Sequence, residues 1–235
     1  MILSDILSLA RLYVPEVDST VISDVNVTII LNQAAQKFVY LSEALPSSTL
    51  FNAVASQQGY NLSTYVTTYA KPRPEGLWWY DSANSTWTQL KARTIKWLDE
   101  NFPKWRDQAA GNPQYYSIDG DEITVHPKPN TSYTNGFKLY HFKVSVDMIA
   151  GYYPFSGSNS VRYPFLNNYE EDLIDYYKYR AKQIMGYGDQ AQEALDMFTN
   201  KALKAKSELL ARPDLTDARV KPQTRYGSNG GMFRG

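Results

Sequence analysis

An Asp-Gly pair between two runs of alternating apolar and polar residues constrains this chain most strongly. Asp119-Gly120 suits a two-residue type I′ turn, whose two central residues both need positive φ. We expect Ile118 to lie opposite Asp121 across this turn, because that pairing keeps apolar and polar residues on separate faces. The residues of the apolar face are then Tyr116, Ile118, Ile123 and Val125. The stretch therefore predicts an antiparallel hairpin with one buried face.

A third strand is expected after this hairpin. Pro127 and Pro129 lack backbone donors and end the second strand, and the next run of alternating residues begins at Phe137. We expect one face of that strand to carry Tyr140, Phe142, Val144 and Val146, and the other Lys138, Lys143 and Ser145, with His141 offset by one. The pattern is typical of a half-buried strand.

Composition narrows the class of protein. The 235 residues include 24 Lys and Arg and 24 Asp and Glu, so no net charge favours a nucleic acid or a membrane as partner. Without cysteine, the chain has no disulfides, thiolate catalysis or cysteine-bound metal. The N-terminus lacks a basic signal-peptide region, and no apolar run is long enough to span a membrane. We expect a soluble protein made in the cytosol.

The periodicity changes twice along the chain. Helical spacing covers residues 3–14 and 24–45, two-residue alternation dominates 49–92, a short helix is expected over 94–105, and helical spacing returns over 168–186 and 189–209. The predicted fold class is α+β, with two N-terminal and two long C-terminal helices in a bundle and a central antiparallel β insertion. The predicted domains are residues 1–48 with 164–212 for the bundle, 49–163 for the β-rich insertion and 213–235 for an extended arm.

The arm has no hydrophobic period. It is rich in Gly, Pro and polar residues, which predicts disorder in the isolated chain. Its candidate anchors for a partner are basic, aromatic and apolar residues: Arg219, Lys221, Arg225, Tyr226, Met232, Phe233 and Arg234. An inert solvated tail is the alternative.

The chain is rich in aromatic residues, which make up 14% of it. Trp78 and Trp79 are consecutive, so a strand would point them to opposite faces, one buried and one exposed. With Trp87 and neighbouring tyrosines they could form a stacking surface for glycans or single-stranded nucleic acid. Aromatic side chains that fill a sheet core are the alternative.

No residues are nominated for catalysis, for a metal or for a cofactor. His126 and His141 stand on predicted strands without the spacing of metal ligands, and the turn already accounts for Asp119 and its acidic neighbours. The acidic residues 170–175 open a helix, where the macrodipole favours them. We expect no enzymatic activity, although a hydrolase domain of a tail fibre or spike is a residual alternative.

The order of elements resembles that of head-to-tail adaptor (connector) proteins of tailed bacteriophages. The residues that carry the resemblance are Trp105, Gly111-Asn112-Pro113, Tyr115-Tyr116, Ile123, His126-Pro127-Lys128-Pro129, Leu139-Tyr140 and the tyrosine-bearing helix after Tyr163-Pro164. In such proteins a Gly-x-Pro entry precedes a hairpin that ends in Pro-x-Pro. The large β segment at 49–92 departs from the family, so its tail-facing surface is not carried over.

The resemblance implies a structural role in the virion, at the head–tail junction, after assembly in the host cytoplasm. Such adaptors form a ring below the portal protein, commonly twelvefold, that joins capsid to tail and lets DNA pass without sequence specificity. The implied partners are the portal protein, neighbouring copies in the ring and tail or nozzle proteins, with no membrane. The arm after Arg212 would contact the portal or a neighbour, and Trp78, Trp79, Trp87 and Tyr115 would face the tail or another subunit.

Overall fold

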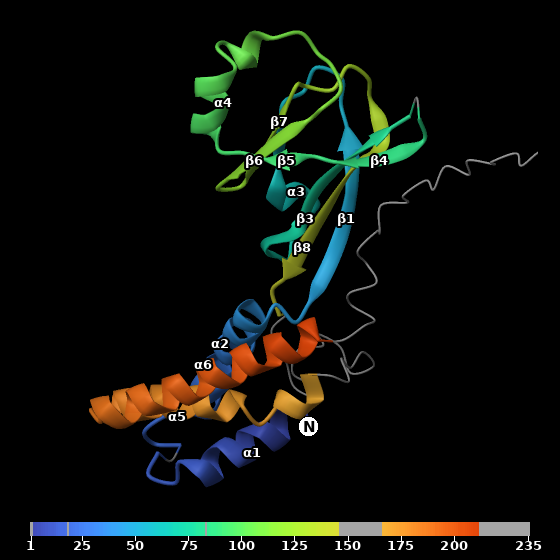
Figure 1. Cartoon of the computed structure of the whole chain (residues 1–235). Coiled ribbons are helices and arrows are strands. Elements are labelled where there is room, and N and C mark those ends of the chain that lie inside the picture. The colour runs from blue at the N-terminus through green and yellow to red at the C-terminus, as the bar shows by residue number, and fades with distance from the viewer. Residues whose placement is uncertain (1, 18, 83, 146–165, 212–235) are drawn as a thin grey trace, which may run out of the picture.

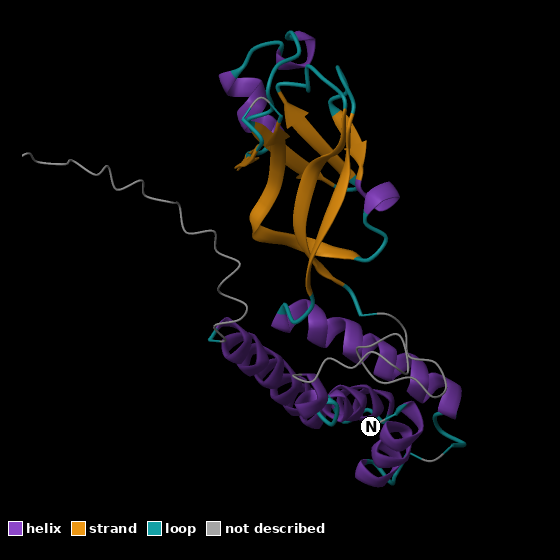
Figure 2. Cartoon of the chain, turned by 90° about the vertical axis from the view of Figure 1, so that its right-hand side faces the viewer, coloured by secondary structure: helices purple, strands orange, loops and turns teal. Residues whose placement is uncertain are grey.

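A computed structural model describes residues 2–17, 19–82, 84–145 and 166–211. The long helices gather at one end of the molecule, and the strands with short helices beside them lie at the other (Figures 1 and 2). The elements are, in chain order, α1 Leu3–Tyr13, α2 Asp24–Ser42, β1 Pro46–Ala53, β2 Gly59–Asn61, α3 Leu62–Tyr65, β3 Tyr69–Asp81, β4 Thr86–Gln89, β5 Lys91–Ala92, α4 Ile95–Asn101, η1 Trp105–Asp107, β6 Tyr115–Asp119, β7 Glu122–His126, β8 Tyr133–Lys143, η2 Leu166–Tyr169, α5 Leu173–Ile184 and α6 Gly188–Leu210. The predicted α+β class is confirmed.

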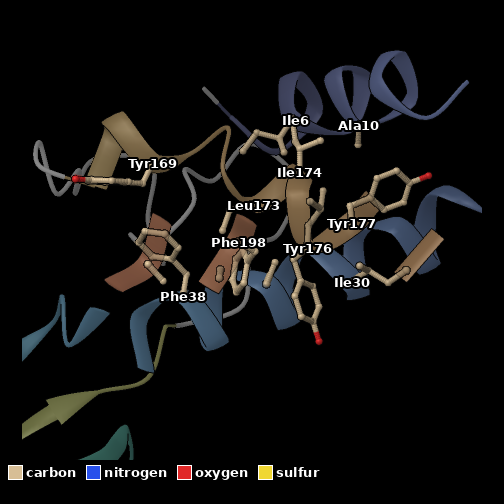
Figure 3. Packing of buried hydrophobic residues seen from close by; sticks show 14 of the residues in the cluster. Ile6, Ala10, Ile30, Phe38, Tyr169, Leu173, Ile174, Tyr176, Tyr177 and Phe198 are labelled. Carbon is tan, nitrogen blue, oxygen red and sulfur yellow. The ribbon is translucent and has the colours of Figure 1, made fainter. Parts of the chain in front are cut away.

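The helical end has a core formed by α1, α2, α5 and α6 (Figure 3). Ser23 begins α2 as its N-cap, because its hydroxyl accepts the Asn26 amide N–H at 3.3 Å. Phe38 on α2 packs edge-on against Phe198 on α6, with ring centroids 6.0 Å apart. The small residues of α6 lie on the same side as Phe198, which lets the helices approach closely. The predicted apolar seam of 189–209 is therefore buried.

The strand end is a sandwich of two four-stranded sheets. The first sheet has the order β1-β8-β3-β4 and the second β2-β7-β6-β5. Side chains from both sheets, from α3 and from the adjoining loops form a second core that shares no residue with the helical core: Phe51, Ala53, Tyr60, Leu62, Val66, Leu77, Trp79, Leu90, Tyr116, Ile123, Val125, Phe137 and Leu139. Among the described strands, every pair is antiparallel except β5 with β6, which is parallel. The separation of 1–48 with 164–212 from 49–163 as domains stays a prediction.

The hairpin at Asp119 forms, but its register differs from the predicted one. Ile118 lies opposite Ile123 rather than Asp121, and Asp119 pairs with Glu122. The turn residues are therefore Gly120-Asp121, with positive φ at Gly120 alone, as in a type II′ turn. A shift of two residues leaves every side chain on its face, so alternation could not distinguish the two registers.

The third predicted strand is present as β8, but most of its buried side chains lie on the other face. Leu139 and His141 are fully buried and Tyr140 is half-buried, although Phe142 of the predicted face is buried too. The predicted Val146 lies outside the described residues. The strand also leaves the hairpin and runs between β1 and β3 in the first sheet. Both neighbours contribute side chains to each face, so alternation within β8 alone does not identify the core side.

Several boundaries also differ from the predicted ones. Residues 62–65 lie within the predicted stretch of two-residue alternation but form α3, because Asn61 accepts the Thr64 amide N–H as an N-cap. Residues 71–76 belong to β3 as an irregular stretch of pairing. α5 begins at Leu173 rather than at residue 168, and α6 begins at Gly188. The part of the predicted β-rich insertion after residue 145 lies outside the described residues.

Candidate interaction surfaces

The outer face of the first sheet carries two of the predicted surface tryptophans. Trp78 lies opposite Lys138 of β8, and Tyr80 lies opposite Trp87 of β4, so all four side chains project from the side away from the core. We call this the outer aromatic face and define it by Leu50, Trp78, Tyr80, Trp87, Lys138 and Tyr140. Its rings contact one another in pairs, with centroids 5.3 Å apart for Tyr80 and Trp87 and 6.2 Å for Trp78 and Tyr140.

Basic side chains already cover much of the outer aromatic face. Lys138 Nζ lies 4.7 Å from the centre of the Tyr140 ring, and Arg73 Cζ lies 5.7 Å from it. The Trp78 indole N–H donates to the carbonyl oxygen of Glu75 at 2.8 Å. These contacts stabilise the rings as part of the molecule and leave Trp87 as the most accessible tryptophan, 37% exposed.

Trp79 is not a surface residue, which corrects its placement among residues facing the tail or a subunit. Its side chain is 2% exposed and packs against Phe137, with ring centroids 5.2 Å apart. The prediction that Trp78 and Trp79 point to opposite faces is confirmed. The three tryptophans therefore form no common stacking platform, which removes the main support for a glycan- or nucleic-acid-binding module.

Tyr115 belongs to a different aromatic cluster, in the second sheet. Its ring lies 5.3 Å from Trp97 and 5.5 Å from Phe102, measured between centroids. His126 is buried among Tyr115, Phe102 and Trp105, and this burial lowers the pKa of its imidazole. The four predicted residues are thus divided among the outer aromatic face, the core and this second cluster. Trp97 and Phe102 were not singled out, although their spacing on a short helix was visible.

The helical end exposes apolar side chains that the sequence analysis did not identify. Val25 is 70% exposed and Ile29 is 49% exposed, one turn apart on α2. On α1, Leu12 is 73% exposed. The helical spacing of the sequence could have identified them, because Val25 and Ile29 fall outside the buried stripe of α2, which includes Val27 and Ile30. Exposed apolar residues grouped on a helix are typical of an interface with another protein.

The predicted arm residues Arg219, Lys221, Arg225, Tyr226, Met232, Phe233 and Arg234 lie outside the described residues. Among the residues that the structure describes, no group of three acidic or histidine side chains could hold a metal ion. Within the same residues, no helix is long and apolar enough to cross a bilayer.

The helical end thus exposes apolar side chains, and the sandwich joined to it has an aromatic outer face. The model of the family described as SU10 adaptor protein matches residues 1–225. The chain therefore belongs to the SU10 adaptor protein family, a family of structural phage head–tail adaptors, as the sequence resemblance indicated. A comparison with curated proteins gave no match.

Proposed function

We propose that the chain is the subunit of a ring that lies below the portal, joins the capsid to the tail and lets DNA pass. The family match over residues 1–225 is the observation that carries this proposal. Portal and tail must be contacted from two sides, and the elongated arrangement of helical end and sandwich fits that demand (Figure 2). The zero net charge fits a channel that does not hold DNA, because each retained phosphate contact would add salt-dependent affinity.

The orientation follows from the same proposal. The helical end docks on the portal and on neighbouring copies, because it exposes Val25, Ile29 and Leu12. The sandwich faces the tail or nozzle proteins. A closed ring needs two different complementary surfaces on each subunit, so the apolar helix surface and a second surface must meet between copies.

Electron microscopy of the protein mixed with the portal from the same phage tests this function. We expect a second ring stacked on the portal ring, with one adaptor for each portal subunit. The absence of added density at saturating adaptor concentration would overturn the proposal.

A deletion of residues 213–235 tests the role of the arm. In this proposal the arm contributes contact area to a neighbour or to the portal, at an ordering cost that assembly recovers. We expect the shortened chain to keep its circular dichroism spectrum and its unfolding midpoint but to form no ring on the portal. Normal assembly of the shortened chain would remove the arm from the proposal and leave the ring itself intact.

A further inference from the structure

Among the described residues, one edge of β6 has no neighbouring strand beyond Tyr116. β5 pairs with β6 only at Tyr115 and Tyr116, and the chain leaves the sheet at Arg93, whose amide N–H donates to the Tyr116 carbonyl at 2.8 Å. In a parallel pair, the backbone N–H and C=O groups of every second residue point toward the partner strand. Those of Ile118 therefore point to the side where β5 would continue. Within the described chain, no strand pairs with that side of Ile118.

An open groove of about 690 Å³ follows this free edge. Ser117, Ile118 and Asp119 of β6 form one wall, and the start of α4 with Trp97 forms the other. The edge supplies hydrogen-bonding groups, while Ile118 and the Trp97 ring supply apolar surface. The groove therefore has the composition of a site that receives an extended peptide as an added strand.

The groove has a cation at one end, the Arg93 guanidinium. The Arg93 guanidinium lies 4.9 Å from the centre of the Trp97 ring and donates to the Ala92 carbonyl at 2.8 Å. No carboxylate of the described residues forms an ion pair with it. Arg106 is a useful contrast, because it also stacks on a tryptophan, at 4.3 Å from Trp105, but is paired with Asp99 at 2.7 Å.

We propose that this edge, the β6 groove, docks an extended segment of a partner protein that carries an acidic residue against Arg93. The backbone of the segment pairs with Ile118, and its side chains alternate between the face of Ile118 and the opposite face, on which Trp97 packs against Tyr115. Its carboxylate completes a charge-assisted hydrogen bond with Arg93. The arm of the chain itself is a poor occupant, because residues 213–235 carry two Asp and four Lys or Arg. The groove is present in a single chain, so the inference does not depend on ring assembly.

Titration with short peptides, followed by NMR of the full chain, tests the proposal. The probe is a blocked seven-residue peptide of alternating valine and threonine with one central glutamate. The matched peptides replace the glutamate by glutamine, or methylate the backbone nitrogens that would donate to β6. We expect saturable shifts of the Ile118 and Arg93 amide signals, about tenfold weaker binding of the glutamine peptide and at least tenfold weaker binding of the methylated one.

Two variants distinguish peptide binding in the β6 groove from nonspecific binding. Arg93→Gln is expected to make the glutamate and glutamine peptides bind equally, whereas Arg106→Gln is expected to leave their tenfold difference unchanged. Equal binding of all peptides to the unaltered chain, or no binding at millimolar concentration, would overturn the proposal. Tighter binding of a peptide covering residues 213–222 would also overturn it, by making the arm the occupant. None of these results bears on whether the portal ring forms.

Discussion

The carboxylate of Glu43 forms an ion pair with Lys71 of β3, with 2.8 Å between Oε1 of Glu43 and Nζ of Lys71. The same oxygen lies 2.7 Å from Nζ of Lys206 on α6. Glu43 follows α2 directly, so its side chain joins a helix end, a strand of the sandwich and the last helix. The ion pairs therefore connect the helical end to the sandwich.

Replacing Glu43 by glutamine should weaken this junction. Burial raises the pKa of Glu43, but the hydrogen bonds and charges of Lys206 and Lys71 outweigh burial and lower it overall. The pairs are partly exposed, so we expect a loss of about 1 kcal/mol in the free energy of unfolding at pH 7. Urea denaturation followed by circular dichroism measures it, with Glu193→Gln on the exposed side of α6 as the control.

The effect of Glu43→Gln should depend on pH with a definite sign. A carboxylate whose pKa is lowered in the folded state contributes its full stabilisation of the fold at pH values above its ordinary pKa of 4.5. This contribution is lost as the pH falls through the folded-state pKa. The stability difference between the unaltered chain and Glu43→Gln should therefore be full at pH 7 and shrink as pH falls below 4.5, through the folded pKa of Glu43. A difference that persists unchanged at pH 3 would show that the loss is not electrostatic.

Periodicity predicted the helices and most strands, but not the way the sheets are built. The stripe of α2 and the seam of α6 follow from spacing alone, since each helix faces one core. β8 lies between two strands, and the identity of its buried face depends on β1 and β3, which are far away in the sequence. The two-residue shift at Gly120-Asp121 was likewise invisible, because it leaves both faces of the hairpin unchanged.

The two separate cores predict that the two ends respond differently to core mutations. All five tryptophans lie between residues 78 and 105, so tryptophan fluorescence reports on the sandwich, while ellipticity at 222 nm reports mainly on the helices. Leu139→Ala should cost about 2–5 kcal/mol and lower the urea midpoint seen by fluorescence. Phe198→Ala should cost about 3–5 kcal/mol and lower mainly the midpoint seen at 222 nm.

Leu203→Ala, on an exposed site of α6, is the control for these core variants and should move neither midpoint. If both probes shift equally for both core variants, the molecule unfolds as one cooperative unit and the predicted domains are not independent.

Two buried histidines should make stability fall in mild acid. Burial lowers the pKa of His141, the nearby Lys143 and Arg73 lower it further, and a hydrogen bond to the Phe142 carbonyl opposes them. The unfolded chain binds a proton below pH 6.5 that the folded chain does not, so stability is full above 6.5 and falls below it. Each histidine should contribute at most about 1.4 kcal/mol per pH unit.

Urea denaturation between pH 7.5 and 5.5 tests this dependence. His141→Gln should reduce the slope of stability against pH, and the double variant with His126→Gln should reduce it further, since burial also lowers the pKa of His126. Glutamine keeps a polar group beside Thr49, whose hydroxyl lies 3.1 Å from Nε2 of His141. A slope unchanged in the double variant would assign the pH dependence to other groups.

The surfaces were harder to predict than the cores. Trp78, Trp79, Trp87 and Tyr115 were grouped by residue type, but their exposure depends on which strands lie beside them. The edge at Ile118 is unpaired because β5 ends at Ala92, and the sequence of β6 itself does not indicate where β5 ends. A surface is defined by what the fold leaves uncovered, so it follows only from the complete arrangement.

The exposed apolar residues of α2 should matter for assembly and not for folding. Val25→Lys combined with Ile29→Lys removes two side chains that contribute little to the core, and lysine is a better helix former than valine. We expect the free energy of unfolding to change by about 0.5 kcal/mol or less, while rings on the portal are lost because the lysines must be desolvated at the interface. Glu193→Lys on the exposed side of α6 controls for added charge. Rings that form normally with the double variant, counted by electron microscopy at matched concentration, would show that this face of α2 is not the contact surface.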